Sequence, residues 1–347
     1  MKNSKTSIVR ALGMSILFGL SSTSFAEFVS QPTQNNAATN WSSADVSQLL
    51  SEDDDEVSST PAVTSSVTTT LRSSTTVSSN PAPSQQYAIR DTVGYSNQPL
   101  VSARAALVMD AQTGEVLYSK NTNASLPIAS ITKLMTAVVT ADARLDMSEQ
   151  ITLQQIDFAG AGGKNSSSTL RVGDSMNRAE ALLFALMKSE NPAAAALART
   201  YPGGRTAFYA AMNAKARQLG MTSTHYIEST GLDPHNVSSA RDLGILVSTA
   251  SQYGLIRQFS TTPTYDFNLG YRVLKSNNTN ALVRNGIWNI NLSKTGFINE
   301  AGRCVVMHTT VNSRPTVVVL LGATSTQSRN NDATALLNWV SQFPKRT

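Results

Sequence analysis

The spacing of apolar residues divides the folded part of the chain into two strands, a helical block and three further strands. The strands are predicted from short apolar runs, and the first two flank a glycine-containing turn as in an antiparallel hairpin. The predicted strands are Ala105–Asp110, Val116–Tyr118, Trp288–Thr295, Cys304–Thr310 and Thr316–Leu321. The simplest packing places all five in one antiparallel sheet.

Between the two groups of strands, apolar residues recur three and four positions apart, which predicts helices. The first begins near Ser130, because Leu134, Met135, Val138 and Val139 fall on one helical face. The others are predicted over Arg178–Lys188, Arg205–Leu219, Arg241–Tyr253 and, at the end of the chain, Asp332–Phe343. The fold class is therefore α+β: a five-stranded antiparallel sheet covered by helices, with a helical lobe inserted between its strands.

The first 26 residues have the pattern of an export signal rather than of the fold. Lys2, Lys5 and Arg10 make a basic start, an apolar run follows to Leu20, and small residues precede Glu27. The apolar run is about half the roughly 20 residues that a membrane helix needs. We expect cleavage near Ala26, a periplasmic protein, and no integral membrane segment in the mature chain.

Residues 27–98 lack any helical or strand period and predict a disordered, acidic tether rich in serine and threonine. Between Val57 and Asn80, 15 of 24 residues are serine or threonine, and an acidic block spans 51–56. Such a composition cannot bury enough apolar surface to offset the entropy of ordering. The segment is either a spacer or a poorly constrained extension. Residues 99–347 are then expected to form the catalytic domain.

Charge and cysteine content narrow the function classes. The formal charge of +5 is made of +3 in residues 1–26, −6 in 27–98 and therefore +8 in 99–347. A basic domain favours anionic partners, but export and the lack of clustered basic residues argue against nucleic acid. The single cysteine, Cys304, lies on a predicted strand, so no disulfide framework is expected and a buried, inert thiol is predicted.

Ser130 and Lys133 stand one helical turn apart at the start of the first predicted helix, so their side chains can meet. A serine hydroxyl is a poor nucleophile unless a base removes its proton, and a neutral lysine can be that base. A serine three residues before a lysine occurs often by chance, so this pair indicates a catalytic site only if other motifs accompany it. Two follow: Ser189-Glu190-Asn191, and Lys294-Thr295-Gly296 on a predicted strand.

The three motifs occur in the order Ser-x-x-Lys, Ser-x-Asn and Lys-Thr-Gly, as in serine β-lactamases and penicillin-binding proteins. Acyl transfer needs each part. Lys133 must have a lowered pKa, which burial and a neighbouring cation such as Lys294 would provide. Ser189 can relay a proton to the leaving amine, and Asn191 can orient the substrate or Lys133. Lys294 and Thr295 can pair with a substrate carboxylate, while Gly296 lets the strand approach closely.

The folded part of the chain resembles the serine penicillin-binding proteins of low molecular mass, over about residues 100–342. The resemblance is strongest to the D-alanyl-D-alanine endopeptidase branch, the penicillin-binding protein 7 type. Besides the three motifs, it rests on Tyr201-Pro202-Gly203-Gly204, on 211–216 and on His235-Asn236-Val237-Ser238. It implies the β-lactamase/transpeptidase-like fold, in agreement with the elements predicted above.

The resemblance also implies roles for the motif residues. Ser130 would form the acyl-enzyme, Lys133 would accept its proton, Ser189 would serve proton transfer and Lys294 would bind substrate. The backbone N–H groups of Ser130 and Phe297 would form the oxyanion hole. The expected partners are peptidoglycan stem peptides, whose cross-links this branch cleaves, and β-lactam antibiotics as covalent inhibitors. No cofactor and no metal are expected.

Four alternatives stay open. A D-alanyl-D-alanine carboxypeptidase would carry the same motifs. A class A β-lactamase would need a glutamate between the second and third motifs; the only one there is Glu228, which we interpret as structural. A zinc peptidase would need paired histidines, whereas His225, His235 and His308 are scattered. A non-catalytic wall-binding module would keep the groove without the complete set of motif residues.

Overall fold

The computed structural model describes residues 95–160 and 168–345. The predicted signal peptide and nearly all of the predicted tether lie outside these residues. Tyr95, the first described residue, is already packed against the domain. Its hydroxyl donates to Glu115 at 2.6 Å, and its ring stacks on Phe343.

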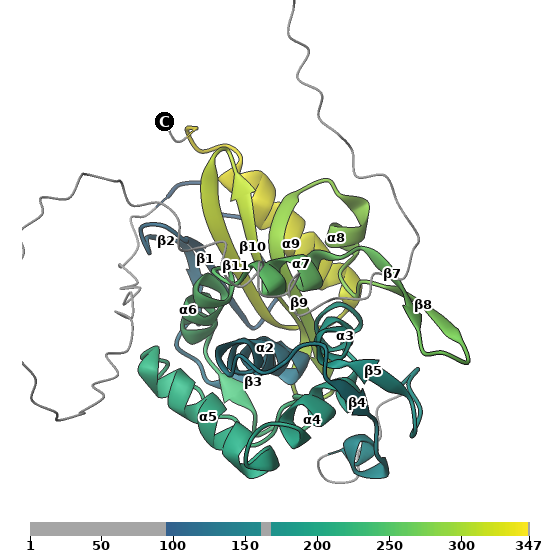
Figure 1. Cartoon of the computed structure of the whole chain (residues 1–347). Coiled ribbons are helices and arrows are strands. Elements are labelled where there is room, and N and C mark those ends of the chain that lie inside the picture. The colour runs from purple at the N-terminus through teal and green to yellow at the C-terminus, as the bar shows by residue number, and fades with distance from the viewer. Residues whose placement is uncertain (1–94, 161–167, 346–347) are drawn as a thin grey trace, which may run out of the picture. The chain divides into compact units, whose positions relative to one another are not determined.

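A single five-stranded antiparallel sheet forms the centre of the domain, in the order β2-β1-β11-β10-β9 (Figure 1). Its strands are β1 (Ala105–Asp110), β2 (Val116–Lys120), β9 (Asn289–Ile298), β10 (Gly302–Val311) and β11 (Arg314–Ala323). All five predicted strands are confirmed, with ends shifted by a few residues. The first two strands and the last three pair through β1 and β11, so the chain returns to its starting strand after the helical block.

Both faces of the sheet are covered, and each strand alternates between two cores. Leu107 and Met109 of β1 belong to the core on one face, whereas Ala106 and Val108 belong to the core on the other. The second core is closed by α9 (Thr326–Val340). This period of two is what a strand requires, and it explains why the strand residues are apolar almost continuously.

The helical lobe is inserted between β2 and β9 and packs on the first core (Figure 1). Its helices are α2 (Thr132–Asp142), α3 (Arg178–Leu183), α4 (Asn191–Arg199), α5 (Gly204–Gln218), α6 (Ala240–Ala250), α7 (Gly254–Thr261) and α8 (Ala281–Asn285). Three two-stranded ribbons accompany them: β3 (Leu126–Pro127) with β6 (Val237–Ser238), β4 (Gln150–Thr152) with β5 (Ser175–Asn177), and β7 (Thr264–Asn268) with β8 (Val273–Asn277).

The predicted helices are confirmed, most of them with ends shifted by a few residues, and two differ more from the prediction. The last helix begins at Thr326 instead of Asp332, because Ser325 caps it by accepting a hydrogen bond from the Ser328 N–H. The polar run before Asp332 has no apolar period, so only the cap marks this start. The segment predicted as one helix over Arg178–Lys188 is an α-helix followed by a π-helical turn, η4 (Phe184–Lys188).

Some elements were not predicted, notably α4, α7 and the β7–β8 hairpin. Helix α4 has Pro192 in its first turn, where the missing N–H costs nothing, so this proline begins a helix. Among the described residues, no helix has both the length and the apolarity to cross a membrane.

Candidate active site

Ser130 lies in the 3₁₀ turn η1 (Ala129–Ile131) that leads directly into α2. Ser130 is half-buried and stands immediately before the helix, as predicted. Ala129, immediately before it, has a φ of +47°, which a residue with a Cβ rarely adopts. The strained turn and the positive end of α2 together present the Ser130 hydroxyl at the edge of the buried lobe.

Lys133 is completely buried and its amine has three oxygen neighbours. Nζ lies 3.0 Å from Ser130 Oγ, 2.6 Å from Asn191 Oδ1 and 2.6 Å from the Thr230 carbonyl oxygen. Burial lowers the pKa of Lys133 from 10.5 to about 7, although the carboxylates of Glu228 and Glu190 act in the opposite direction. The amine is thus within reach of the serine proton and is half-deprotonated near neutral pH.

Ser189 and Asn191 stand at a break between two helices. Ser189 ends the π-helical turn η4 in the left-handed conformation, with a φ of +66°, and Asn191 begins α4. The break turns the two side chains to different lysines: Ser189 Oγ accepts from Lys294, and Asn191 Oδ1 accepts from Lys133. The middle motif therefore joins the other two.

Lys294 is buried on β9 and donates to Ser189 Oγ at 2.9 Å and to the Thr295 carbonyl oxygen at 2.8 Å. Burial lowers its pKa well below the ordinary value, and the positive charges of Lys133 and Arg329 lower it further. Two lysines thus lie in one buried site, and the charge of Lys133 makes it harder for Lys294 to hold its proton. The Thr295 hydroxyl donates to Thr279 Oγ1 at 2.7 Å.

Two glycines allow the backbone around Ser130 to be this tightly packed. A Cβ on Gly296 would lie 3.1 Å from the Ser130 amide nitrogen and 2.9 Å from the Ile128 carbonyl oxygen. A Cβ on Gly231 would lie 1.9 Å from the Ala129 carbonyl oxygen, and its φ of +81° also requires glycine. The sequence predicted the close approach at Gly296. The second approach, at Gly231, was not predicted.

Phe297 follows Gly296 on the edge strand β9 and is 44% exposed. The guanidinium of Arg303 lies 3.5 Å from the centre of its ring, across the β9–β10 pair. Because side chains alternate along a strand, Phe297 points to the face opposite that of Lys294. Its role as an oxyanion donor through its backbone N–H stays a prediction.

The structure adds residues that sequence reasoning did not single out. Thr230 holds Lys133 through its carbonyl oxygen, Thr279 orients Thr295, and Arg329 adds positive charge behind Lys294. Every residue has a backbone carbonyl, so the residue type at 230 does not reveal that this carbonyl binds Lys133. Its position between Glu228 and Gly231 is the only signal in the sequence.

Sequence reasoning also did not single out Glu190, the central residue of the Ser-x-Asn motif. Its buried carboxylate accepts from Ser168 Oγ at 2.5 Å, and from the N–H and hydroxyl of Thr169 at 3.1 and 2.6 Å. It thereby ties the segment at 168–169 to Ser189 and Asn191. The Ser-x-Asn motif identifies only Ser189 and Asn191 as site residues, because any residue type can stand at its middle position.

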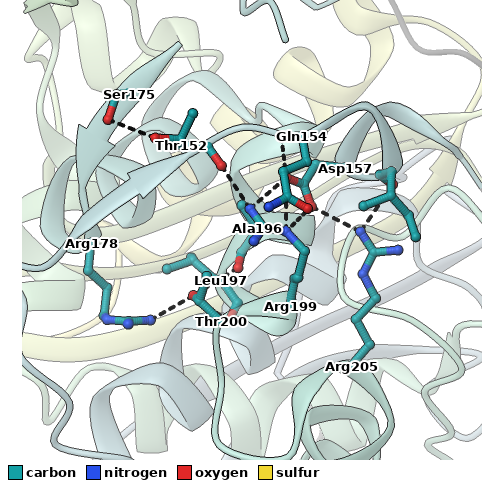
Figure 2. A network of polar contacts seen from close by, with 11 residues as sticks. Thr152, Gln154, Asp157, Ser175, Arg178, Ala196, Leu197, Arg199, Thr200 and Arg205 are labelled. Carbon is teal, nitrogen blue, oxygen red and sulfur yellow. Dashed lines mark hydrogen bonds and ion pairs between the residues drawn. The ribbon is translucent and has the colours of Figure 1, made fainter. Parts of the chain in front are cut away.

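A network of ion pairs borders the site on the side of α4 and α5 (Figure 2). The fully buried carboxylate of Asp157 accepts from Arg199 and from Arg205, at 2.9 and 3.0 Å for the closest pairs. Asp157 also closes a capping box with the Gln154 N–H, at 2.9 Å. The arrangement fixes the short 3₁₀ turn η2 (Gln155–Phe158) against the ends of α4 and α5.

The other residues considered in the sequence have structural contacts. Glu228 accepts from the N–H groups of Thr230 and Gly231 and from Asn236 Nδ2, which is consistent with a structural carboxylate. Cys304 is buried in β10, and burial raises its pKa to about 11, so the predicted inert thiol is confirmed. No group of three or more potential metal ligands from His, Cys, Asp and Glu occurs within residues 95–160 and 168–345.

The arrangement can perform nucleophilic acyl transfer. It provides a serine, a lysine that exchanges protons near pH 7, a second serine bonded to a second buried lysine, and tightly packed backbone beside the nucleophile. The motif side chains form two sets of contacts, Ser130–Lys133–Asn191 and Ser189–Lys294, which are joined by the short segment from Ser189 to Asn191. The spacing of the motifs along the sequence could not predict these distances, but it did predict which residues come together.

Comparisons with known proteins agree with this geometry. Residues 92–325 match the family model described as D-alanyl-D-alanine carboxypeptidase. The chain is 46% identical over 271 residues to a D-alanyl-D-alanine endopeptidase of Pseudomonas aeruginosa, covering 76% of this chain and 83% of that protein. It is 44% identical over 255 residues to a D-alanyl-D-alanine endopeptidase of Escherichia coli, covering 71% and 79%.

Solved structures show the same fold. The DD-transpeptidase of Streptomyces K15 aligns with a TM-score of 0.64 and 29% identity, covering 70% of this chain and 98% of that chain. A D-alanyl-D-alanine carboxypeptidase from Mycobacterium tuberculosis H37Rv aligns with a TM-score of 0.65 and 26% identity, covering 74% and 96%. The predicted β-lactamase/transpeptidase-like fold is confirmed.

Proposed function

Because the chain belongs to the D-alanyl-D-alanine carboxypeptidase family of serine peptidases, we propose that it is a serine DD-peptidase acting on peptidoglycan stem peptides. The observation that carries the proposal is the contact of 3.0 Å between Ser130 Oγ and the buried amine of Lys133, whose pKa is about 7. A lysine in this state can accept the serine proton without a cofactor or a metal.

In the first half of the reaction, Ser130 Oγ attacks the carbonyl carbon of the D-alanine that precedes the cut bond, and the hydroxyl proton moves to Lys133 Nζ. The negative charge that develops on the carbonyl oxygen is taken by the N–H groups of Ser130 and Phe297. The leaving amine receives, through Ser189, the proton that Lys133 took from Ser130, so Lys133 is neutral again; Ser189 is itself bonded to Lys294. These steps leave the substrate acyl group on Ser130.

In the second half, a water molecule attacks the acyl-enzyme, Lys133 again takes a proton, and Ser130 regains its own. Asn191 and the Thr230 carbonyl oxygen fix the lysine amine in both halves, so it returns to the same place after each proton transfer. Lys294 and Thr295 would hold a substrate carboxylate. A β-lactam would form the same acyl-enzyme, because its ring opens on attack by Ser130.

Cleavage of cross-links, rather than removal of a terminal D-alanine, is supported by the relatives. The two endopeptidases are 46% and 44% identical to this chain, whereas carboxypeptidases of Bacillus subtilis and Escherichia coli are 31% and 30% identical. We therefore propose a D-alanyl-D-alanine endopeptidase. Carboxypeptidase activity on the same site is the second candidate, since both reactions use one acyl-enzyme.

We also propose that the protein is exported and periplasmic, with cleavage near Ala26, and that residues 99–347 form its catalytic domain. This proposal rests on the basic and apolar pattern of the first 26 residues and on the substrate, which is a wall polymer. The first 94 residues lie outside the described part of the chain.

Covalent labelling with a fluorescent penicillin tests the acyl-enzyme. The wild-type protein should be labelled, and Ser130→Ala should not, because no other group replaces the hydroxyl at the helix start. Labelling that survives in Ser130→Ala would defeat the assignment. A non-catalytic wall-binding module would bind peptidoglycan without any label.

Digestion of purified sacculi separates the two peptidase activities. Cross-linked dimers that turn into monomers indicate endopeptidase, whereas pentapeptides that turn into tetrapeptides indicate carboxypeptidase. A chromogenic cephalosporin distinguishes a β-lactamase: the acyl-enzyme should persist and give less than one turnover per second. Many turnovers per second would overturn the proposal in favour of a β-lactamase.

A further inference from the structure

Glu190 occupies the N-cap position of α4, between the two motif side chains that face the buried lysines. N-cap positions favour short polar residues, whose side chains accept a bond from the start of the helix. Within the described chain, the Glu190 carboxylate makes no such capping bond, and both of its oxygens accept from the segment at 168–169 instead. The helix that follows therefore does not explain the residue type at position 190.

The Glu190 carboxylate is also buried, with only 4% of the residue exposed. Taking a carboxylate out of water is costly unless donors and positive charges surround it. Three donors do so here, at 2.5, 2.6 and 3.1 Å. A neutral side chain could hold the same segment at lower cost, so the negative charge needs an explanation within the site.

The charged groups around Glu190 belong to the catalytic centre. Burial lowers the pKa of Lys133, and the carboxylates of Glu228 and Glu190 oppose this effect. Burial also lowers the pKa of Lys294, and the positive charge of Lys133 adds to it. Lys188 lines the same cleft as Glu190. Two carboxylates thus lie among three lysines, and the loss of one carboxylate would leave the site more positive.

Thr169 connects Glu190 to the β7–β8 hairpin, which projects from the lobe (Figure 1). Its N–H and hydroxyl donate to Glu190, while its carbonyl oxygen accepts from Arg272 at 3.1 Å. Arg272 lies in the turn between β7 and β8, and the same terminal nitrogen donates to the buried carboxylate of Asp174 at 2.7 Å. The segment 168–174 is therefore held on one side by the Ser-x-Asn turn and on the other by the hairpin.

We propose that Glu190 is a positioning residue, which fixes the Ser-x-Asn turn between the two buried lysines and supplies a fixed negative charge beside them. The inference rests on the proposed function, because it assumes that Ser130 is acylated with Lys133 as the base. It adds an electrostatic role for the middle position of the motif. It also makes the β7–β8 turn, through Arg272, an outer support of the active site.

The test is the pH profile of penicillin labelling in Glu190→Gln, which keeps the shape of the side chain and removes its charge. The plateau rate should fall about tenfold, because the amide replaces a charged acceptor of the 168–169 segment. The midpoint of the acid limb should shift to lower pH, because the pKa of Lys133 loses a carboxylate that raises it. The wild-type rate at pH 6 should be about a tenth of its plateau, and this fraction should increase in the variant.

Thr169→Val separates position from charge, because it removes one hydrogen bond to Glu190 and leaves the carboxylate. Its plateau rate should fall about threefold, the effect of one neutral donor, and its midpoint should stay at the wild-type value. Arg272→Gln should behave in the same way. Glu300→Gln is the matched control, because Glu300 is an exposed glutamate in the turn between β9 and β10, and it should keep both the rate and the midpoint.

A midpoint that stays at the wild-type value in Glu190→Gln would overturn the inference even if the rate fell, because a merely structural role would lower the rate alone. An unchanged plateau in both Glu190→Gln and Thr169→Val would overturn it as well. If Glu190→Gln failed to fold, unchanged rates in Thr169→Val and Arg272→Gln would decide against it.

The two proposals fail in different ways. A wild-type protein that takes no penicillin label would contradict the proposed function. A wild-type protein that is labelled with an acid limb near pH 7, and whose limb is unchanged in Glu190→Gln, would leave the peptidase intact and contradict only the role of Glu190.

Discussion

The rate at which Ser130 is acylated should rise with pH up to about 7 and then level off. The reason is that Lys133 must lose its proton before it can accept the one from Ser130. Burial holds the pKa of Lys133 at about 7, and the group is fully enclosed. The acid limb of the profile should therefore have its midpoint near pH 7.

The magnitude follows from the fraction of neutral amine. A lysine with its ordinary pKa of 10.5 would be neutral in about 3 molecules in 10,000 at pH 7, whereas Lys133 is neutral in about half. The buried position thus increases the reactive form about a thousandfold. Below the midpoint, the rate should fall about tenfold for each pH unit.

The lowered pKa of Lys133 also makes the stability of the fold depend on pH. Because the folded pKa is depressed below the unfolded one, the unfolded chain binds more protons between pH 7 and 10.5. Stability should therefore rise with pH through this window, by at most about 1.4 kcal/mol per pH unit from this group. Lys133→Met should remove this part of the slope in urea unfolding.

The assay is the second-order rate constant for labelling by a fluorescent penicillin, measured from pH 5 to 10. Lys133→Ala should lose about 10² to 10⁴ in rate, which is the range of general base catalysis, and should lose the acid limb. Lys275→Ala, an exposed lysine on β8, is the control and should keep the wild-type profile. A flat profile between pH 5 and 8, or a midpoint near 10, would refute the reasoning.

Three further changes have definite expectations. Lys294→Ala should raise KM for carboxylate-bearing substrates while leaving the acid limb near pH 7, because Lys294 faces Ser189; steady-state kinetics at several pH values would show it, and an unchanged KM would count against it. Gly231→Ala should reduce penicillin labelling at least a hundredfold, since its Cβ would overlap the Ala129 carbonyl oxygen. Asp157→Asn should lower the free energy of unfolding by about 3 kcal/mol in a denaturant titration, because it removes the buried anion of two arginines.

The sequence predicted the fold because its signals are local and repeated. Apolar runs marked all five strands of the sheet, and helical spacing marked the largest helices. The sequence failed where a single local cue decides the boundary. Ser325 caps α9 seven residues before Asp332, where the helix was predicted to begin, and Pro192 lies in the first turn of α4. The β7–β8 hairpin has one mainly exposed face and few apolar residues, so its pattern is weak.

The residue types alone determined which side chains take part in the candidate site. A serine one helical turn before a lysine, a serine two before an asparagine, and a lysine before threonine and glycine are sufficient to name Ser130, Lys133, Ser189, Asn191 and Lys294. Their order along the chain and their chemistry predict an acylating site. The structure bonds Lys133 to Ser130 and Asn191, and Lys294 to Ser189.

Only the tertiary structure decided the state of these groups. The pKa of Lys133 depends on the removal of water from its amine and on the carboxylates of Glu228 and Glu190, which lie far from it in the sequence. Desolvation and the distance between charges are properties of packing, and a sequence pattern fixes neither of them.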